Sequence, residues 1–117
     1  MSIESYTNVY ITNTTFWNNY DDKTQASTLY ASDNSTIYMK DTMFQYNVGG
    51  IGGAISLRRS SKLRVRDSYF NSNIAMTQAG VLSVDQYCEA WIDSCHFEEN
   101  VALSSIAVLK SSKAEDI

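Results

Sequence analysis

The chain has 117 residues, of which 44% are hydrophobic and 19% are charged, so it can form one folded domain and does not have a disordered composition. Its formal net charge is -4, with acidic and basic residues interspersed, so it lacks the basic clusters of a nucleic-acid-binding surface. No apolar run approaches the roughly 20 residues of a membrane-spanning helix, and the N-terminal residues lack the features of a signal peptide.

Short runs in which apolar and polar residues alternate recur along the chain. Successive side chains of a β-strand point to opposite faces, so each run predicts a short strand with one face inward. No segment has a sustained helical periodicity, and Ser, Thr, Asn, Asp and Gly fill the gaps between the runs. In chain order, the predicted strands are centred on residues 9–11, 37–39, 55–57, 63–65, 82–84 and 90–92.

The sequence also repeats itself. An apolar residue is followed after eight residues by a second apolar residue, after five more by Phe, and after three more by Asn. The two apolar positions hold Ile3, Ala31, Leu57 and Val84, and then Ile11, Met39, Val65 and Ile92. The phenylalanines are Phe16, Phe44, Phe70 and Phe97, spaced by 28, 26 and 27 residues, and the asparagines are Asn19, Asn47, Asn73 and Asn100.

A fixed period of this length is typical of a solenoid. Equivalent strands one period apart can pair if the chain winds as a coil that rises ~4.8 Å per turn. We therefore expect an all-β fold without helices of note, a right-handed parallel β-helix that forms a single domain over residues 1–117. The sequence predicts about four coils of 25–28 residues, with the start of a further one, at residues 3–30, 31–56, 57–83, 84–108 and 109–117.

In such a fold, equivalent residues of successive coils become vertical neighbours. The four phenylalanines then form an interior aromatic column, and the four asparagines form a second column whose side-chain amides can bond along the axis. The asparagines and the glycines that follow them are expected to turn the backbone at a corner. Because the chain begins and ends within a coil and has no polar cap, we expect it to be a window of a longer solenoid.

Two short motifs resemble those of a known family. Gly52-Gly53-Ala54-Ile55 and Phe70-Asn71-Ser72-Asn73 are similar to the G-G-A-I and F-x-x-N motifs of the chlamydial polymorphic outer membrane protein repeats. The F-x-x-N half recurs in all four periods, and the G-G-A-I half becomes Ala79-Gly80-Val81-Leu82 in the next period. The resemblance covers nearly the whole chain. It implies a right-handed parallel β-helix displayed as an adhesive or other surface structure, and it implies no catalytic residue.

One outward column of the second predicted strand is rich in aromatic side chains. Exposed Tyr, Trp and Arg are typical anchors of binding surfaces, so this column is a candidate face for sugars or for another chain. Ordinary cross-strand pairing is the alternative. In the neighbouring column, Arg66 is able to pair with Asp93 across one coil. The candidate binding face consists of Tyr10, Tyr38, Arg64 and Trp91.

Polar residues also stand three positions before each phenylalanine, at Asn13, Asp41, Asp67 and Ser94. Asp41 and Asp67 are expected one coil apart, as in paired-carboxylate enzymes. The mixture of Asn, Asp and Ser favours the other interpretation, a side-chain-to-backbone bond at a turn. His96 is the single histidine and has no cluster of further ligands, so we expect no metal site and no cofactor.

Modification sites are the remaining candidates. Cys88 and Cys95 are seven residues apart and permit either one local disulfide or two partly buried free thiols. Asn13-Thr14-Thr15 and Asn34-Ser35-Thr36 fit the N-glycosylation pattern, and Asn34 is expected to be the better exposed acceptor.

These expectations favour a non-enzymatic structural or adhesive segment of an extracellular or cell-surface β-helix, in a rod or filament. The expected partners are proteins, through end-to-end or lateral self-association, and glycans. No nucleic acid and no membrane span in this segment are expected. The alternatives are a polysaccharide-binding module, a polysaccharide lyase or hydrolase fragment that uses Asp41 and Asp67, and an intracellular scaffold such as a ciliary component.

Overall fold

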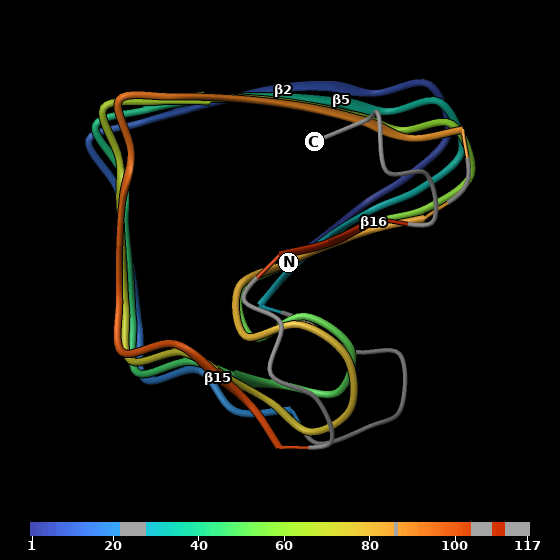
Figure 1. Cartoon of the computed structure of the whole chain (residues 1–117). Helices are drawn as coiled ribbons and strands as arrows, with labels where there is room; N and C mark the ends of the chain where they lie inside the picture. Colours follow the sequence, from blue (N-terminus) through green and yellow to red (C-terminus); the bar gives the residue numbers. More distant parts are fainter. Residues whose placement is uncertain (22–27, 86, 104–108, 112–117) are drawn as a thin grey trace.

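A computed structural model describes residues 1–21, 28–85, 87–103 and 109–111, the last three through their backbone alone. The described chain contains only short strands and winds as a parallel β-solenoid, seen along its axis in Figure 1. No helix in this part of the chain is long and apolar enough to cross a membrane.

A complete turn contributes one strand to each of four parallel sheets, which we number in the order in which the chain reaches them. The first sheet contains β1 (Ser2–Ile3), β4 (Leu29–Ala31), β8 (Ile55–Leu57), β12 (Leu82–Val84) and β16 (Leu109–Ser111). The second sheet contains β2 (Asn8–Thr12), β5 (Thr36–Lys40), β9 (Lys62–Arg66) and β13 (Glu89–Asp93). The third sheet contains β3 (Thr15–Trp17), β6 (Met43–Gln45), β10 (Tyr69–Asn71) and β14 (His96–Glu98). The fourth sheet contains β7 (Val48–Gly49), β11 (Ile74–Ala75) and β15 (Val101–Ala102).

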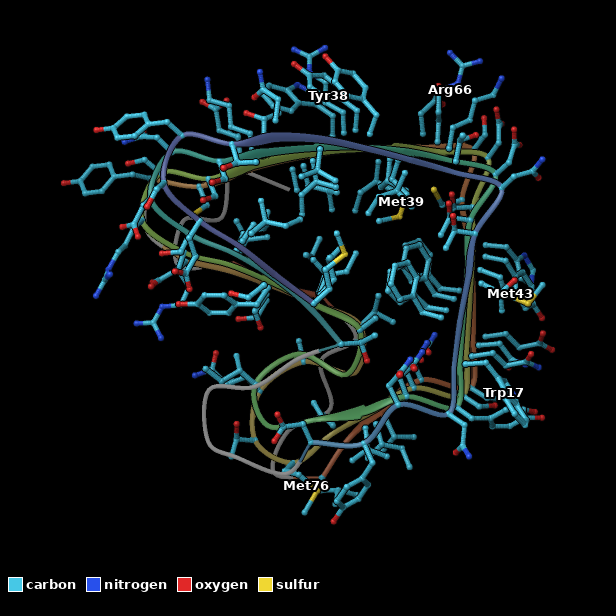
Figure 2. All side chains as sticks on the ribbon, turned by 180° about the vertical axis from the view of Figure 1, so that it is seen from behind. Trp17, Tyr38, Met39, Met43, Arg66 and Met76 are labelled. Carbon is cyan, nitrogen blue, oxygen red and sulfur yellow. The ribbon has the colours of Figure 1, made fainter. Side chains whose placement is uncertain are left out.

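The register of the strand pairs follows the sequence repeat. Phe70 pairs with Phe44 of the preceding turn and with Phe97 of the following turn. In the second sheet, Tyr38 likewise lies between Tyr10 and Arg64. The predicted alternation is also present, because Figure 2 shows Met39 inside the coil and its neighbour Tyr38 outside it. Residues at one position of the repeat therefore become vertical neighbours, as the periodicity predicted.

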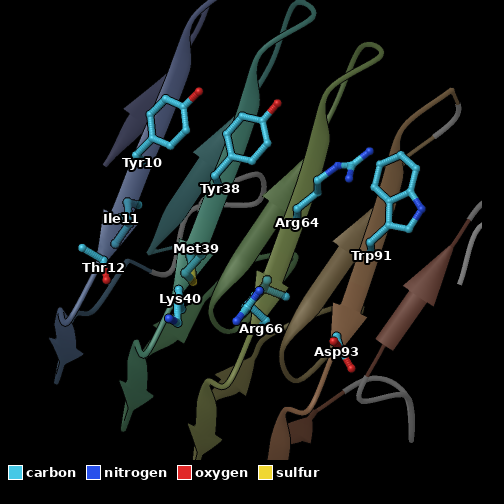
Figure 3. Close-up of a pocket in the computed structure, with 11 residues that line it drawn as sticks. Tyr10, Ile11, Thr12, Tyr38, Met39, Lys40, Arg64, Arg66, Trp91 and Asp93 are labelled. Carbon is cyan, nitrogen blue, oxygen red and sulfur yellow. The ribbon is translucent and has the colours of Figure 1, made fainter.

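Two features of the winding can be compared with the prediction. The second sheet in Figure 3 shows its outer face, its strands run downward, and each later turn lies to the right of the earlier one, so the winding is right-handed. The number of turns is slightly smaller than the predicted four, because within the described residues three turns have strands in all four sheets. In the described part of the first turn, the fourth sheet is met by an isolated bridge from Tyr20 to Val48 instead of a strand. β16 begins the next coil, whereas residues 104–108 and 112–117 lie outside the described residues.

The phenylalanines form the predicted interior column. The ring centroids of Phe16 and Phe44 are 4.5 Å apart, those of Phe44 and Phe70 are 5.2 Å apart, and those of Phe70 and Phe97 are 5.0 Å apart. Phe44 and Phe70 are fully buried, whereas Phe16 and Phe97 at the two ends are only partly buried. Each interior ring is thus covered on both faces by an equivalent ring, and burial of these rings is a large part of the core.

The asparagines form the predicted second column, and its hydrogen bonds are complete in the interior. Asn73 Nδ2 donates to Phe44 O of the preceding turn (3.0 Å) and to Asn100 Oδ1 of the following turn (2.9 Å). Its Oδ1 accepts from the backbone N–H of Asn47 (3.1 Å) and from Asn47 Nδ2 (2.9 Å). Asn47 makes the same four bonds with Asn19, Phe16 and Asn73. A buried amide with both donors and both acceptor positions used avoids the cost of an unsatisfied polar group.

Glycines and the column asparagines were expected to turn the backbone at the corners, but other residues do so. None of the glycines has a positive φ, whereas 15 other described residues do. Asn13, Asp41, Asp67 and Ser94 have φ between 50° and 52° at the corner between the second and third sheets. At the next corner the left-handed residue is the one before each column asparagine, at Asn18, Tyr46, Ser72 and Glu99. Asn and Asp tolerate this conformation best among residues with a Cβ, which accounts for their presence at the first of these corners.

The glycines instead permit close approach between turns. A Cβ on Gly53 would lie 2.1 Å from the carbonyl oxygen of Gly80, and a Cβ on Gly80 would lie 2.8 Å from the backbone nitrogen of Val101. Both obstructing atoms belong to the backbone of the following turn. This accounts for the second glycine of the G-G-A-I motif at Gly53 and for its survival in the degenerate copy at Gly80.

The interior position of the asparagine column gives a first prediction. Replacing Asn73 by Ala leaves the buried backbone N–H and one Nδ2 hydrogen of Asn47 without an acceptor, and it removes the Nδ2 donor to the Phe44 carbonyl, so the free energy of unfolding should fall by about 3 kcal/mol or more. The matched control Asn19→Ala, at the exposed end of the column, should cost about 1 kcal/mol. Urea unfolding followed by circular dichroism measures both, and equal losses would contradict the burial argument.

The close contact at Gly53 gives a second prediction. Gly53→Ala should lower the free energy of unfolding by roughly 3 kcal/mol, because the obstructing carbonyl belongs to the backbone and cannot rotate away. Gly49→Ala is the control, since Ala75 and Ala102 occupy the equivalent position in the next two turns. Thermal unfolding of the two variants should separate them clearly, and a Gly53→Ala variant as stable as the control would disprove the contact.

Candidate binding face

The candidate face is the outer surface of the second sheet, whose strands are the longest in the solenoid. In each five-residue strand, the second and fourth residues point into the core, and the first, third and fifth point outward. The third position carries the predicted column, so the register places Tyr10, Tyr38, Arg64 and Trp91 side by side on four successive turns. Tyr10 and Trp91 are 74% and 43% exposed, which confirms that the column faces solvent.

The members of this column contact one another in two pairs. The rings of Tyr10 and Tyr38 stack with centroids 4.8 Å apart and planes 9° from parallel. Arg64 Cζ lies 4.5 Å from the centroid of the Trp91 ring, in a cation–π contact. One face of each of the three rings is therefore covered by a neighbour, and the Tyr hydroxyl groups point toward the beginning of the strands, away from Lys40 and Arg66 (Figure 3). A sugar has less ring face to stack on here than a single exposed aromatic residue would offer.

A shallow groove of about 560 Å³ runs beside the column along the solenoid axis. One wall is the aromatic column, and the other is formed by Thr12, Lys40, Arg66 and Asp93, at the fifth position of each strand. The two walls differ in chemistry, because the first is largely apolar and the second carries charges. Within each wall, successive residues are spaced along the axis like the strands, ~4.8 Å apart. The groove thus offers an extended ligand an apolar side and a charged side that repeat with the coils.

The charges of the second wall are partly compensated at the adjacent corner. Lys40 Nζ lies 3.8 Å from Asp41 Oδ2, and Arg66 Nε lies 3.4 Å from Asp67 Oδ2. The expected ion pair of Arg66 with Asp93 is replaced by this contact with the next residue in the chain. Because these pairs are exposed, each contributes less than ~1 kcal/mol, and a ligand can displace them at little cost.

The corner carboxylates are explained by the backbone. Asp41 and Asp67 lie on successive turns, as expected, but both take the left-handed conformation that Asn13 and Ser94 share. The expected side-chain-to-backbone bond is made one residue later, where Thr42 and Ser68 hydroxyls donate to the carbonyls of Lys40 and Arg66 at 3.0 and 2.9 Å. The corner therefore accounts for the polar residues without any paired-carboxylate chemistry.

Both cysteines stand in columns of hydroxyl residues. Cys95 follows Thr14, Thr42 and Ser68, and its Sγ donates to the carbonyl of Asp93 at 3.3 Å, as Ser68 does to Arg66. Cys88 follows Thr7, Ser35 and Ser61 in the equivalent position before each strand of the second sheet. In the fourth turn, cysteine thus replaces a hydroxyl residue at two corners. Each cysteine precedes Phe97 by the same number of residues as the hydroxyl residues precede their own phenylalanines, so the sequence could have shown this equivalence.

The candidate disulfide is not formed, since Cys88 and Cys95 are both free thiols. They lie beyond opposite ends of β13, and five residues of strand span roughly 17 Å, far more than the ~5.5 Å between the Cα atoms of a disulfide. Cys88 is buried and Cys95 is partly buried. Burial raises the pKa of each thiol, so the thiolate that would react is disfavoured.

The remaining candidate residues lie on other surfaces. His96 is exposed, stacks on Tyr69 with ring centroids 5.0 Å apart and lies 3.9 Å from Glu98, and Glu98 also accepts a hydrogen bond from the Tyr69 hydroxyl. Within the described residues, no three His, Cys, Asp or Glu side chains group together as metal ligands would. Asn34 is exposed, as expected, and so is Asn13, and both residues have a left-handed backbone.

No protein-family model, no curated protein and no solved structure matches this chain. The resemblance to the polymorphic outer membrane protein repeats therefore stays a prediction based on two motifs.

The state of the cysteines gives a third prediction. Burial raises the pKa values of Cys88 and Cys95 in the folded chain. The pH at which iodoacetamide alkylates each thiol at half its maximal rate should therefore be higher in the folded chain than in the unfolded chain. Cys95 should react first, since it is less buried. Mass spectrometry after unfolding should find two free thiols, and a disulfide-linked mass would contradict the extended path between them.

Proposed function

We propose that the chain is a non-enzymatic structural segment of an extracellular or cell-surface β-helix that presents the groove of the second sheet to a partner. The observation that supports this most is the groove itself, which lies on a continuous parallel sheet of four strands and has an aromatic wall. An apolar groove lined by Tyr, Trp and Arg has the composition of protein-binding surfaces. Adhesion is therefore the activity that this surface suits best.

The packing beneath the groove supports the same proposal. The side chains of the groove stand on strands whose opposite faces are packed on the core, as Met39 and Val65 are beneath Lys40 and Arg66. A surface held in this way loses little conformational entropy when a partner binds. The floor of the groove is thus preorganised for an extended ligand that lies across several turns.

A glycan is the second candidate partner, and the polar wall is the observation that favours it. Lys40, Arg66 and Asp93 offer donors and an acceptor along the groove. A linear polysaccharide would bind through these groups and the ring edges rather than through ring-face stacking. A protein partner would thus depend mainly on the aromatic wall of the groove, and a glycan mainly on its polar wall.

The proposal predicts selective loss of adhesion when the aromatic wall is shortened. Surfaces coated with the chain should retain cells or glycans from an array, and Tyr38→Ala should reduce the retained signal at least tenfold because it removes the centre of that wall. Tyr69→Ala is the matched control, since Tyr69 is also an outward tyrosine in a middle turn that stacks on a neighbouring ring, but lies outside the groove.

Cell retention that survives glycosidase treatment of the cells would identify a protein partner, and retention that is lost would identify a glycan. Equal losses in Tyr38→Ala and Tyr69→Ala, or no retention of cells or glycans by the unmodified chain, would refute the proposed adhesive role.

A further inference from the structure

The groove beside the aromatic column has the width of one extended chain. Its walls are the third and fifth residues of each strand of the second sheet, so the two columns lie ~6.6 Å apart along the strand direction. An α-helix is ~10 Å across with its side chains, so it is too wide to lie between the walls. The groove thus suits a single chain in an extended conformation that runs along the solenoid axis.

The repeat of the groove distinguishes between extended peptide conformations. Equivalent side chains of the walls recur every ~4.8 Å along the axis. In a β-strand, side chains on one face recur every ~6.7 Å, which matches neither one coil nor two. In a polyproline II helix, they recur at every third residue, after ~9.3 Å, which is close to the ~9.6 Å of two coils. A polyproline II segment can therefore present equivalent side chains to every second coil and stay in register.

The aromatic wall is also divided into units of two coils. The rings of Tyr10 and Tyr38 stack with centroids 4.8 Å apart, and Arg64 Cζ lies 4.5 Å from the centroid of the Trp91 ring. Each pair occupies two successive turns, so the two pairs are spaced like successive turns of polyproline II. Proline-rich segments bind aromatic-lined grooves because their conformation is formed before binding and little entropy is lost.

Basic side chains are concentrated on the two middle turns of the same face. All three outward residues of β9 are basic, and Lys40 of β5 lies in the neighbouring turn. These residues are four of the nine lysines and arginines in a chain whose formal net charge is -4. They are Lys40, Lys62, Arg64 and Arg66. β2 and β13 flank the two turns, so the cluster lies on the side of the solenoid.

Nearby carboxylates use only some of the donors of this cluster. Asp41 and Asp67 contact Lys40 and Arg66 from the corner beyond the polar wall, at 3.8 and 3.4 Å. The Arg66 contact uses Nε, and arginine carries further N–H donors on its two terminal nitrogens. Lys40 and Arg66 are paired in register on adjacent strands, ~4.8 Å apart, so one carboxylate placed between them can contact both.

We propose that the groove binds a proline-rich segment of a partner protein in the polyproline II conformation. The prolines pack on the aromatic wall, and an acidic side chain of the segment lies between Lys40 and Arg66 on the opposite wall. Polyproline II has no internal hydrogen bonds, so its carbonyl groups can also accept from the polar wall. This inference rests on the adhesive function proposed above and names the chemistry of the protein partner.

Synthetic peptides test the conformation and the charge of the ligand separately. The probe is a fluorescently labelled peptide of three Pro-Pro-Glu repeats, which carries one carboxylate per turn of polyproline II. Fluorescence anisotropy should show that it binds the chain at least tenfold more tightly than three Pro-Pro-Lys repeats, which have the same backbone and the opposite charge. It should have the same advantage over three Gly-Gly-Glu repeats, which keep the charge but form a flexible coil.

A pair of arginine variants tests the position of the site. Arg66→Glu should weaken binding of the Pro-Pro-Glu peptide at least tenfold, because it replaces an attractive charge in the polar wall by a repulsive one. Arg59→Glu is the matched control, since Arg59 is an exposed arginine of the same turn that also lies in an ion pair, 3.5 Å from Asp33, but outside the groove. Both variants change the net charge equally, so only a local contact can separate them.

Equal affinity for the Pro-Pro-Glu and Gly-Gly-Glu peptides would overturn the polyproline conformation, and equal losses in the two arginine variants would overturn the site. No binding at millimolar peptide, or tighter binding of a linear polyuronate that Arg66→Glu abolishes, would also overturn the peptide ligand, the latter in favour of a glycan. The adhesive role is measured separately, by cell retention on coated surfaces and its loss in Tyr38→Ala. Retention without peptide binding would therefore remove this inference and leave that role standing.

Discussion

Every other feature of the molecule depends on the asparagine column, because it is the contact that a shift in register would break. A phenylalanine can slide along its neighbours at small cost, but a buried amide must find two acceptors and two donors at fixed positions. Asn47 and Asn73 are fully buried and find them only if each turn follows the last in step. The phenylalanine column supplies apolar burial, and the asparagine column selects the register in which that burial occurs.

A fixed register converts a linear repeat into surface columns. The outward positions of the second sheet are not constrained by the core, so Tyr10, Tyr38, Arg64 and Trp91 vary in type while they stay aligned. The groove beside them exists because the strands hold both walls at one spacing over four turns. The proposed binding face therefore has the same physical origin as the core, the register that the asparagine column selects.

The sequence was sufficient to predict the phenylalanine and asparagine columns, but it did not predict the close contacts between the backbones of successive turns. Phe44, Asn47 and their equivalents could be predicted because their offsets are constant, and Tyr38 and Arg64 followed from strand alternation. The role of Gly53 could not, because it depends on how closely the carbonyl of Gly80 approaches in the next turn. The fourth sheet was also missed, since strands of two residues have no alternation to detect.

The most direct test of the in-register winding is the behaviour of the asparagine side chains in solution. Nuclear magnetic resonance of the folded chain should show nuclear Overhauser contacts between the side-chain amides of Asn47 and Asn73, with hydrogen exchange of both amides far slower than that of an exposed asparagine. These residues are 26 positions apart in the sequence and 2.9 Å apart through Nδ2 and Oδ1. Rapid exchange of both amides, without contacts between them, would contradict the stacked solenoid and every conclusion drawn from its columns.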